Sequence, residues 1–256
     1  MVPALVALLL FPQLVDSTDK VGAQAAVEAE ISHEKRGDIY MARKMYREAV
    51  DAYREALGEQ PRSARLYNKL GISFHHQLMF GEARRQYERA SELDRKYAQA
   101  INNLGTVYYA EKRYKKAQKE YEKALKLTPN SASVYSNLGT AFFARNKFKQ
   151  ASQAYLTALE LDPEVFEHRN QAGTLLQERS VEDRAKYYYF MAEAYAKAEI
   201  YDRALLYLRR AFEEGFKDAG KVLGESAFEP LHGVVEFRML VDPEGKILPP
   251  PQQASN

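Results

Sequence analysis

Glycine recurs every 34 residues between positions 37 and 139, and this period constrains the fold more than any other feature of the chain. An alanine follows each of these glycines after twelve residues, and three sets of aromatic residues keep the same interval. A fixed period of this length is typical of a repeat array, in which each unit is one supersecondary element. The glycines are Gly37, Gly71, Gly105 and Gly139, and the alanines are Ala49, Ala83, Ala117 and Ala151.

Each unit is predicted to contain two amphipathic helices joined by a short turn. Leu104 and Tyr108 mark the apolar face of a first helix, and Ala117, Tyr121 and Ala124 mark that of a second, at spacings of three, four and seven. A glycine inside a helix costs about 1 kcal/mol relative to alanine, so the repeated glycine indicates close approach of the two helices. One such pair cannot bury its apolar face alone, and the units must therefore stack.

The residues resemble the tetratricopeptide repeat family at this point. The segments 67–71 (Tyr-Asn-Lys-Leu-Gly) and 135–139 (Tyr-Ser-Asn-Leu-Gly) match the family pattern, and Pro61, Pro129 and Pro163 close their units as it requires. The resemblance covers residues 30–215. It implies an all-α fold, a right-handed α-solenoid of antiparallel helix pairs, with repeats near 30–63, 64–97, 98–131 and 132–165.

Beyond Pro163 the period changes. Gly173 and Tyr189 continue the first phase, whereas Ala192, Tyr195 and Ala204 fit a second phase, advanced by a little more than half a period. We expect a helix at 181–198 to serve both phases, so that a repeat at 166–199 overlaps one at 185–218 and the array gains a half-repeat. The solenoid then runs over 26–225, a capping element follows at 226–242, and the Pro-rich residues 243–256 form a disordered tail.

The amino terminus carries an apolar run from Val2 to Val15 that is too short to span a bilayer as a helix. Ala23-Gln24-Ala25 has the small-x-small form of a signal-peptidase site, so residues 1–25 are predicted to be a cleaved signal peptide. The chain is then exported, to the periplasm or outside the cell, and the mature part has no membrane span. An apolar helix packed on the first repeat, in a cytoplasmic protein, is the alternative.

Composition and motifs argue against an enzyme. The chain has no cysteine, which excludes disulfides and thiolate metal sites, and its net charge of +2 does not indicate nucleic-acid binding. Residues 215–221 have the spacing of a phosphate-binding loop, but Val222 stands where a magnesium ligand is needed. His75 and His76 lack a third ligand and are interpreted as surface histidines. We expect no catalytic residues, metal or cofactor.

The family resemblance implies that ligands contact the first helix of each unit. We expect an extended peptide there, because an asparagine amide both donates and accepts hydrogen bonds, and we stress Asn103 and Asn137; a merely solvated role for these two stays equally open. Lys69 and the two histidines make the early groove basic, which favours an acidic side chain or terminus. Tyr109 and Phe143 would form an apolar floor. The candidate groove residues are Lys35, Arg65, Asn68, Lys69, His75, Asn102, Asn103, Thr106, Tyr109, Asn137, Thr140 and Phe143, with Asp38, Ile72 and Ser136 beside them.

Two functions follow from this pattern. The first is a non-enzymatic protein-interaction module that binds a peptide segment or a protein partner in its groove. The second is a structural or self-associating scaffold that docks through an end face, or through the aromatic run from Tyr187 to Phe190, which exceeds what one helix face buries.

Overall fold

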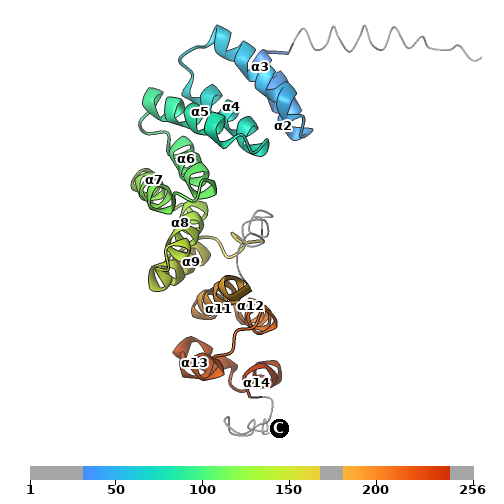
Figure 1. Cartoon of the computed structure of the whole chain (residues 1–256), viewed down its shortest axis with the longest axis vertical. Coiled ribbons are helices and arrows are strands. Elements are labelled where there is room, and N and C mark those ends of the chain that lie inside the picture. Colours follow the sequence, from blue (N-terminus) through green and yellow to red (C-terminus); the bar gives the residue numbers. More distant parts are fainter. Residues whose placement is uncertain (1–30, 168–180, 243–256) are drawn as a thin grey trace, which may run out of the picture.

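Figure 1 shows the computed structural model as a stack of helix pairs that runs from α2 and α3 at one end to α13 and α14 at the other. The structure describes residues 31–167 and 181–242. The predicted signal peptide at 1–25, most of the first helix expected for the fifth repeat, and the tail at 243–256 lie outside the described residues. Those three expectations stay predictions.

The predicted solenoid of antiparallel helix pairs is confirmed. The two helices of each pair pack on each other, and the second helix then packs on the first helix of the next pair. The described residues contain no strand. The four regular pairs are α2 (His33–Ala42) with α3 (Tyr46–Glu59), α4 (Ala64–His76) with α5 (Phe80–Leu93), α6 (Ala98–Ala110) with α7 (Tyr114–Leu127), and α8 (Ala132–Ala144) with α9 (Phe148–Leu161).

The turn inside each pair repeats as regularly as the helices do. The backbone N–H of Met79 donates to the carbonyl of Phe74 at 3.0 Å, and that of Arg113 donates to the carbonyl of Tyr108 at 2.8 Å. This bond closes the last turn of the first helix, and the residue before the donor takes a left-handed conformation. Those left-handed residues are Lys44, Leu78, Lys112 and Asn146, with φ between 58° and 60°.

The recurring glycine is explained by a buried tyrosine on the partner helix, which keeps the same period. A Cβ on Gly105 would lie 2.6 Å from Cε1 of Tyr121, and one on Gly139 would lie 2.5 Å from the ring of Tyr155. The same ring contact occurs in the other two regular pairs. The tyrosine hydroxyl then reaches the residue after the glycine, as when Tyr53 donates to Asp38 at 2.7 Å. Glycine is therefore required by the packing of the partner helix.

The last pair consists of α11 (Val181–Lys197) and α12 (Tyr201–Glu213), and α11 packs directly on α9. Its left-handed turn residue is Glu199, and the interval from Asn146 to Glu199 exceeds one period by the shift that the sequence indicated. The advanced phase is thus confirmed. In this phase Ala192 takes the place of the glycine, and Leu208 takes that of the tyrosine.

The aromatic run in α11 is not an exposed docking surface, which corrects the expectation for Tyr187 to Phe190. Tyr187, Tyr189 and Phe190 are buried, and Tyr188 is half-buried. Because α11 has α9, α12 and η1 (Ser226–Leu231) around it, rings on several faces of the helix are covered by the chain itself.

The end of the array is covered by α13 (Ala219–Gly224), η1 and α14 (Val235–Val241). Phe228 and Phe237 are fully buried there, and α14 packs on α12. The sequence placed the start of the covering segment at residue 226. In the structure the segment begins earlier, with α13. Over the described ranges, no helix is both long and apolar enough to cross a membrane.

Candidate functional site

The first helices of the pairs form the inner side of the solenoid. Helix α4 touches α6, and α6 touches α8, more closely than successive second helices touch each other. A stack that is closer on one side curves toward that side. The predicted groove residues therefore belong to the helices that line the inner side.

A polar ladder connects these first helices, and it consists of three interactions between residues 35 positions apart. Lys69 donates from Nζ to Glu34 Oε1 at 2.7 Å, Asn103 donates from Nδ2 to Asn68 Oδ1 at 2.9 Å, and Asn137 donates from Nδ2 to Asn102 Oδ1 at 2.9 Å. The acceptor always comes from the earlier repeat and the donor from the later one. The donors stand at one position of the 34-residue period and the acceptors at another, so every pair of neighbouring first helices from α2 to α8 is joined in the same way.

The ladder fixes the two amides of α6 in opposite orientations. Asn103 donates one N–H of its Nδ2 to Asn68, and Asn102 accepts from Asn137 through its Oδ1, so the ladder does not use Oδ1 of Asn103 or Nδ2 of Asn102. Among the described residues, neither of these two atoms has a protein partner, and both side chains are half-exposed. We call Asn102 and Asn103 the central amide pair. It offers a donor and an acceptor at adjacent positions of α6.

A hollow of about 520 Å³ opens beside the central amide pair. Gln99 and Asn102 of α6 form one wall, and Ser133 and Val134 of α8 form another. Gln99 and Ser133 are exposed. Its lining mixes apolar residues such as Pro129 and Val134 with the polar side chains of Gln99, Asn102 and Ser133, so it offers a ligand both hydrogen-bonding groups and apolar surface.

The early groove is not the basic surface that the sequence suggested. Lys69 is held by Glu34 and also by Asp38, both at 2.7 Å, and Arg65 pairs with Glu34 at 2.8 Å. Burial lowers the pKa of Lys69, but its hydrogen bonds to Asp38 and Glu34 outweigh burial and raise that pKa. Lys69 is therefore charged at neutral pH, and its ion pairs with Glu34 and Asp38 largely cancel that charge. Lys35, in contrast, has an exposed side chain.

His75 does not add positive charge either. Its ring packs edge-on against Phe80 with centroids 5.5 Å apart, and it is half-buried rather than on the open surface. Burial, with a smaller contribution from His76, lowers the pKa of His75 to about 4. His75 is neutral at physiological pH.

Four further candidates serve the solenoid itself. Tyr109 and Phe143 are 7% and 2% exposed, so the expected apolar floor is covered by the chain. Thr106 and Thr140 donate to the carbonyls of Asn102 and Ser136 in their own helices. They also accept the hydroxyls of the two buried tyrosines at 3.4 and 3.5 Å.

Asn68 and Asn137, 2% and 8% exposed, likewise belong to the interior of the ladder. The contact expected for Asn137 is thus corrected, because its amide joins α8 to α6.

The sequence reasoning missed Glu34, Gln99 and Ser133. Glu34 has a signal in the period, since it stands one full period before Asn68 and directly precedes the counterpart of Lys69. An acid and a base at that spacing would have predicted the first ladder step.

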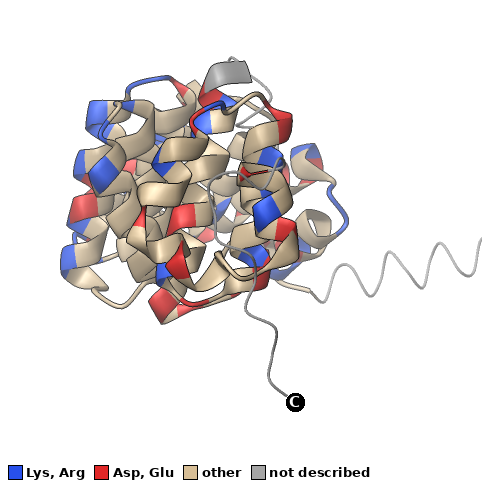
Figure 2. Cartoon of the chain, turned by 90° about the horizontal axis from the view of Figure 1, so that it is seen from below, with Lys and Arg blue, Asp and Glu red and all other residues tan. Residues whose placement is uncertain are grey.

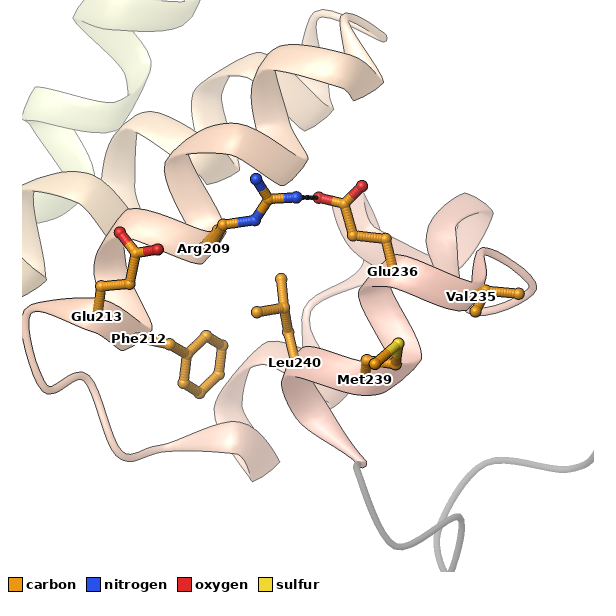
Figure 3. Close-up of a pocket in the computed structure, with 7 residues that line it drawn as sticks. All are labelled: Arg209, Phe212, Glu213, Val235, Glu236, Met239 and Leu240. Carbon is orange, nitrogen blue, oxygen red and sulfur yellow. Dashed lines mark hydrogen bonds and ion pairs between the residues drawn. The ribbon is translucent and has the colours of Figure 1, made fainter.

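A second hollow, of about 600 Å³, lies at the far end of the molecule between α12 and α14. Figure 3 shows Phe212 and Leu240 at its floor and the Arg209–Glu236 ion pair across its rim. Val235 and Met239 are 66% and 70% exposed. The covering segment therefore has an apolar outer surface. In the parts of the chain that the structure describes, no cluster of three His, Asp or Glu side chains is arranged to hold a metal.

Comparisons with known proteins agree on the fold. The family model described as Tetratricopeptide repeat matches residues 31–96 and 97–164. Among solved structures, PilF of Pseudomonas aeruginosa is 24% identical over 86% of this chain and 89% of its own, with a TM-score of 0.54. MamA of Desulfovibrio magneticus RS-1 is 18% identical over 71% of this chain and 92% of its own, with a TM-score of 0.52. No curated protein matches the chain.

Proposed function

Because the chain belongs to the tetratricopeptide repeat family, we propose that it is a non-enzymatic protein-interaction module that binds an extended peptide segment at the central amide pair. Two other features of the groove support this function. The first helices line the inner side of the curve, and a hollow with both polar and apolar lining lies beside Asn102.

The observation that carries the proposal is the orientation of Asn102 and Asn103. An extended backbone offers a carbonyl and an N–H, and the pair offers Nδ2 and Oδ1 in return. Since the ladder already holds both amides, binding orders few further side-chain rotamers, and this lowers its entropic cost. A site of this kind recognises the peptide backbone and makes few contacts with the side chains of the ligand.

Some charge selectivity is expected at the early end of the groove. Lys35 is exposed, and the Arg65 side chain is 61% exposed despite its ion pair with Glu34. These two bases favour an acidic side chain or a terminal carboxylate on the ligand. Lys69 contributes little, because Glu34 and Asp38 already neutralise it.

Asn102→Asp tests the proposal without breaking the ladder. Aspartate keeps the oxygen that accepts from Asn137, but it replaces the outward donor by a second acceptor. Peptides are selected from a random displayed library on the purified protein, and their dissociation constants are then measured for both forms. We expect Asn102→Asp to weaken binding at least about tenfold, which corresponds to roughly 1.4 kcal/mol.

Asn146→Asp is the matched control, because it makes the same charge change in an exposed turn between α8 and α9. It should leave affinity unchanged. If the selected peptides bind Asn102→Asp as tightly as the native chain, the central amide pair is not the binding site.

Docking through an end face is a second candidate, and the hollow between α12 and α14 favours it. Val235 and Met239 are apolar side chains left open to solvent at the end of the array. If copies of the chain associate there, the mass measured by light scattering rises with concentration. Met239→Glu should then return it to the value of a monomer.

Export is also a proposal, supported by the apolar run from Val2 to Val15 and the alanine pattern at 23–25. The mass of the protein recovered from its native cells tests it. A chain that begins at Ala26 is expected, and an intact amino terminus would contradict cleavage.

A further inference from the structure

Helix α7 has a row of lysines on its outer face, which we call the lysine stripe. Four members on α7, Lys116, Lys119, Lys123 and Lys126, are spaced by three, four and three residues, so they fall on one side of the helix over about 15 Å. Lys112 lies in the turn just before α7. Ala117, Tyr121 and Ala124 are buried on the opposite side. Figure 1 shows α7 at the left edge of the stack, on its outer side. The stripe consists of Lys112, Lys115, Lys116, Lys119, Lys123 and Lys126, all of them exposed.

The period of the array supplies an internal comparison for these positions. The solenoid itself requires no basic residue there, because the other outer helices have mixed residues at the same six places. The counterparts on α5 are Leu78, Gly81, Glu82, Arg85, Arg89 and Glu92; on α9 they are Asn146, Lys149, Gln150, Gln153, Thr157 and Glu160; and on α3 and its turn they are Lys44, Arg47, Glu48, Asp51, Glu55 and Gly58. The stripe is therefore a property of one helix.

The charge of the stripe is largely uncompensated. Within the described residues, Lys123 is the one member in an ion pair, with Glu120 at 2.9 Å. Lys116 lies over the ring of Tyr108 at 5.5 Å, an interaction that keeps its charge. On α5, in contrast, Arg85 and Arg89 are each paired with a glutamate in the same helix.

Apart from Glu120, the acidic residues next to the stripe have partners outside it. The carboxylate of Glu111 is held by Arg84 and Arg113, and Glu122 accepts from Gln118. The net charge of +2 conceals this local excess, because acids and bases balance over the whole chain. Figure 2 shows the two signs interspersed on the helices that face the viewer.

We propose that the lysine stripe binds the surface of a membrane that contains anionic phospholipids. A straight ridge of flexible ammonium groups, with no pocket between them, suits a plane of many anions better than one shaped ligand. Each lysine near such a surface contributes independently, so no precise geometry is needed. The apolar run at residues 2–15, proposed above as an export signal, would bring the chain to a membrane. An exported chain is separated from nucleic acids, which makes a lipid the favoured anion.

The test measures binding to vesicles of phosphatidylcholine alone and of phosphatidylcholine with one quarter phosphatidylglycerol. The pure phosphatidylcholine vesicles give the contribution of residues 2–15 where these are retained. We expect tighter binding to the anionic vesicles, lost in 1 M salt, where the screening length falls to about 3 Å. Replacing Lys112, Lys115, Lys119 and Lys126 by glutamine should weaken that binding at least about tenfold.

The control removes four other exposed bases, Arg43, Arg47, Arg62 and Lys217, and so has the same net charge as the test variant. It should keep the affinity of the native chain. Acetylation of lysines on bound vesicles gives a second measurement, in which Lys115 and Lys119 are expected to be protected and Lys217 is not. Equal loss in both variants, or no preference for anionic vesicles, would overturn the proposal. Stripe-dependent binding of duplex DNA without vesicle binding would overturn it in favour of a nucleic acid.

Discussion

The four regular helix pairs and the last pair solve the same packing problem in two ways. In the regular pairs a glycine faces the ring of a buried tyrosine, and in the last pair Ala192 and Leu208 stand at those positions. A smaller partner on α12 leaves room for a methyl group on α11. The comparison shows that the glycine depends on the size of its partner, and that the two positions change together.

Gly105→Ala should have the largest effect, because its methyl group would lie 2.6 Å from Tyr121, a residue 1% exposed. We expect the free energy of unfolding to fall by about 1–3 kcal/mol, the usual cost of overpacking a core. Urea unfolding measures it. Gly81→Ala is the control, since nothing lies within 4 Å of a Cβ there, and it should not destabilise the chain. Equal values for both variants would contradict a steric role of the glycine.

Combining Gly105→Ala with Tyr121→Leu recreates the arrangement of the last pair. The double variant should be more stable than the sum of the two single changes predicts, by about 1–2 kcal/mol, because leucine makes room for the methyl group. A double-mutant cycle gives this coupling energy directly. Additive effects would mean that the two positions vary independently.

Ala192→Gly makes the reverse change in the last pair. Because Leu208 stands where the regular pairs have a tyrosine, the expected result is a loss of about 1 kcal/mol through lower helix propensity alone. The same unfolding measurement applies. A gain in stability would reveal crowding in the last pair like that in the regular ones.

The smallest effect at neutral pH is expected for His75→Phe, which gives the second pair an aromatic residue where the later regular pairs have Tyr109 and Phe143. The pKa of His75 is lowered from 6.5 to about 4 in the folded chain, chiefly by burial. Its contribution to stability is therefore complete above about pH 6.5 and is lost as the pH falls toward 4.

Thermal unfolding between pH 7 and 4 measures this dependence. The phenylalanine variant should lose less stability in acid than the native chain. Some acid sensitivity should remain, because burial also lowers the pKa of His76. An unchanged pH profile would show that His75 is not buried as described.

The fold could be predicted because the period links residues that are near in sequence. Gly105 and Tyr121 belong to the two helices of one unit, and the helix spacing alone indicates that they face each other. The change of phase was also visible, in Ala192 and Tyr195. The sequence did not show which helices surround α11. Periodicity predicts the direction of a side chain, but it does not predict how many helices pack around the helix that carries it. This is why the Tyr187 to Phe190 run was misjudged.

The site was predicted less well, for a different reason. Asn102 and Asn137 are far apart in the sequence, so the hydrogen bond from Nδ2 of Asn137 to Oδ1 of Asn102 could not be predicted from either residue. The sequence indicated which helices line the groove. It could not show which amide atoms remain available, nor that Glu34 cancels the charge of Lys69.

The polar ladder also sets a length. It begins on α2 and ends on α8, because Phe190, which stands in the place of Asn137 on α11, is buried and has no polar group. Four neighbouring helices at about 9–10 Å give a span of roughly 28 Å. Extended chain covers about 3.3 Å per residue, so the span corresponds to about eight or nine residues of peptide. A peptide bound along the ladder, as proposed above, would therefore be contacted over about eight or nine residues.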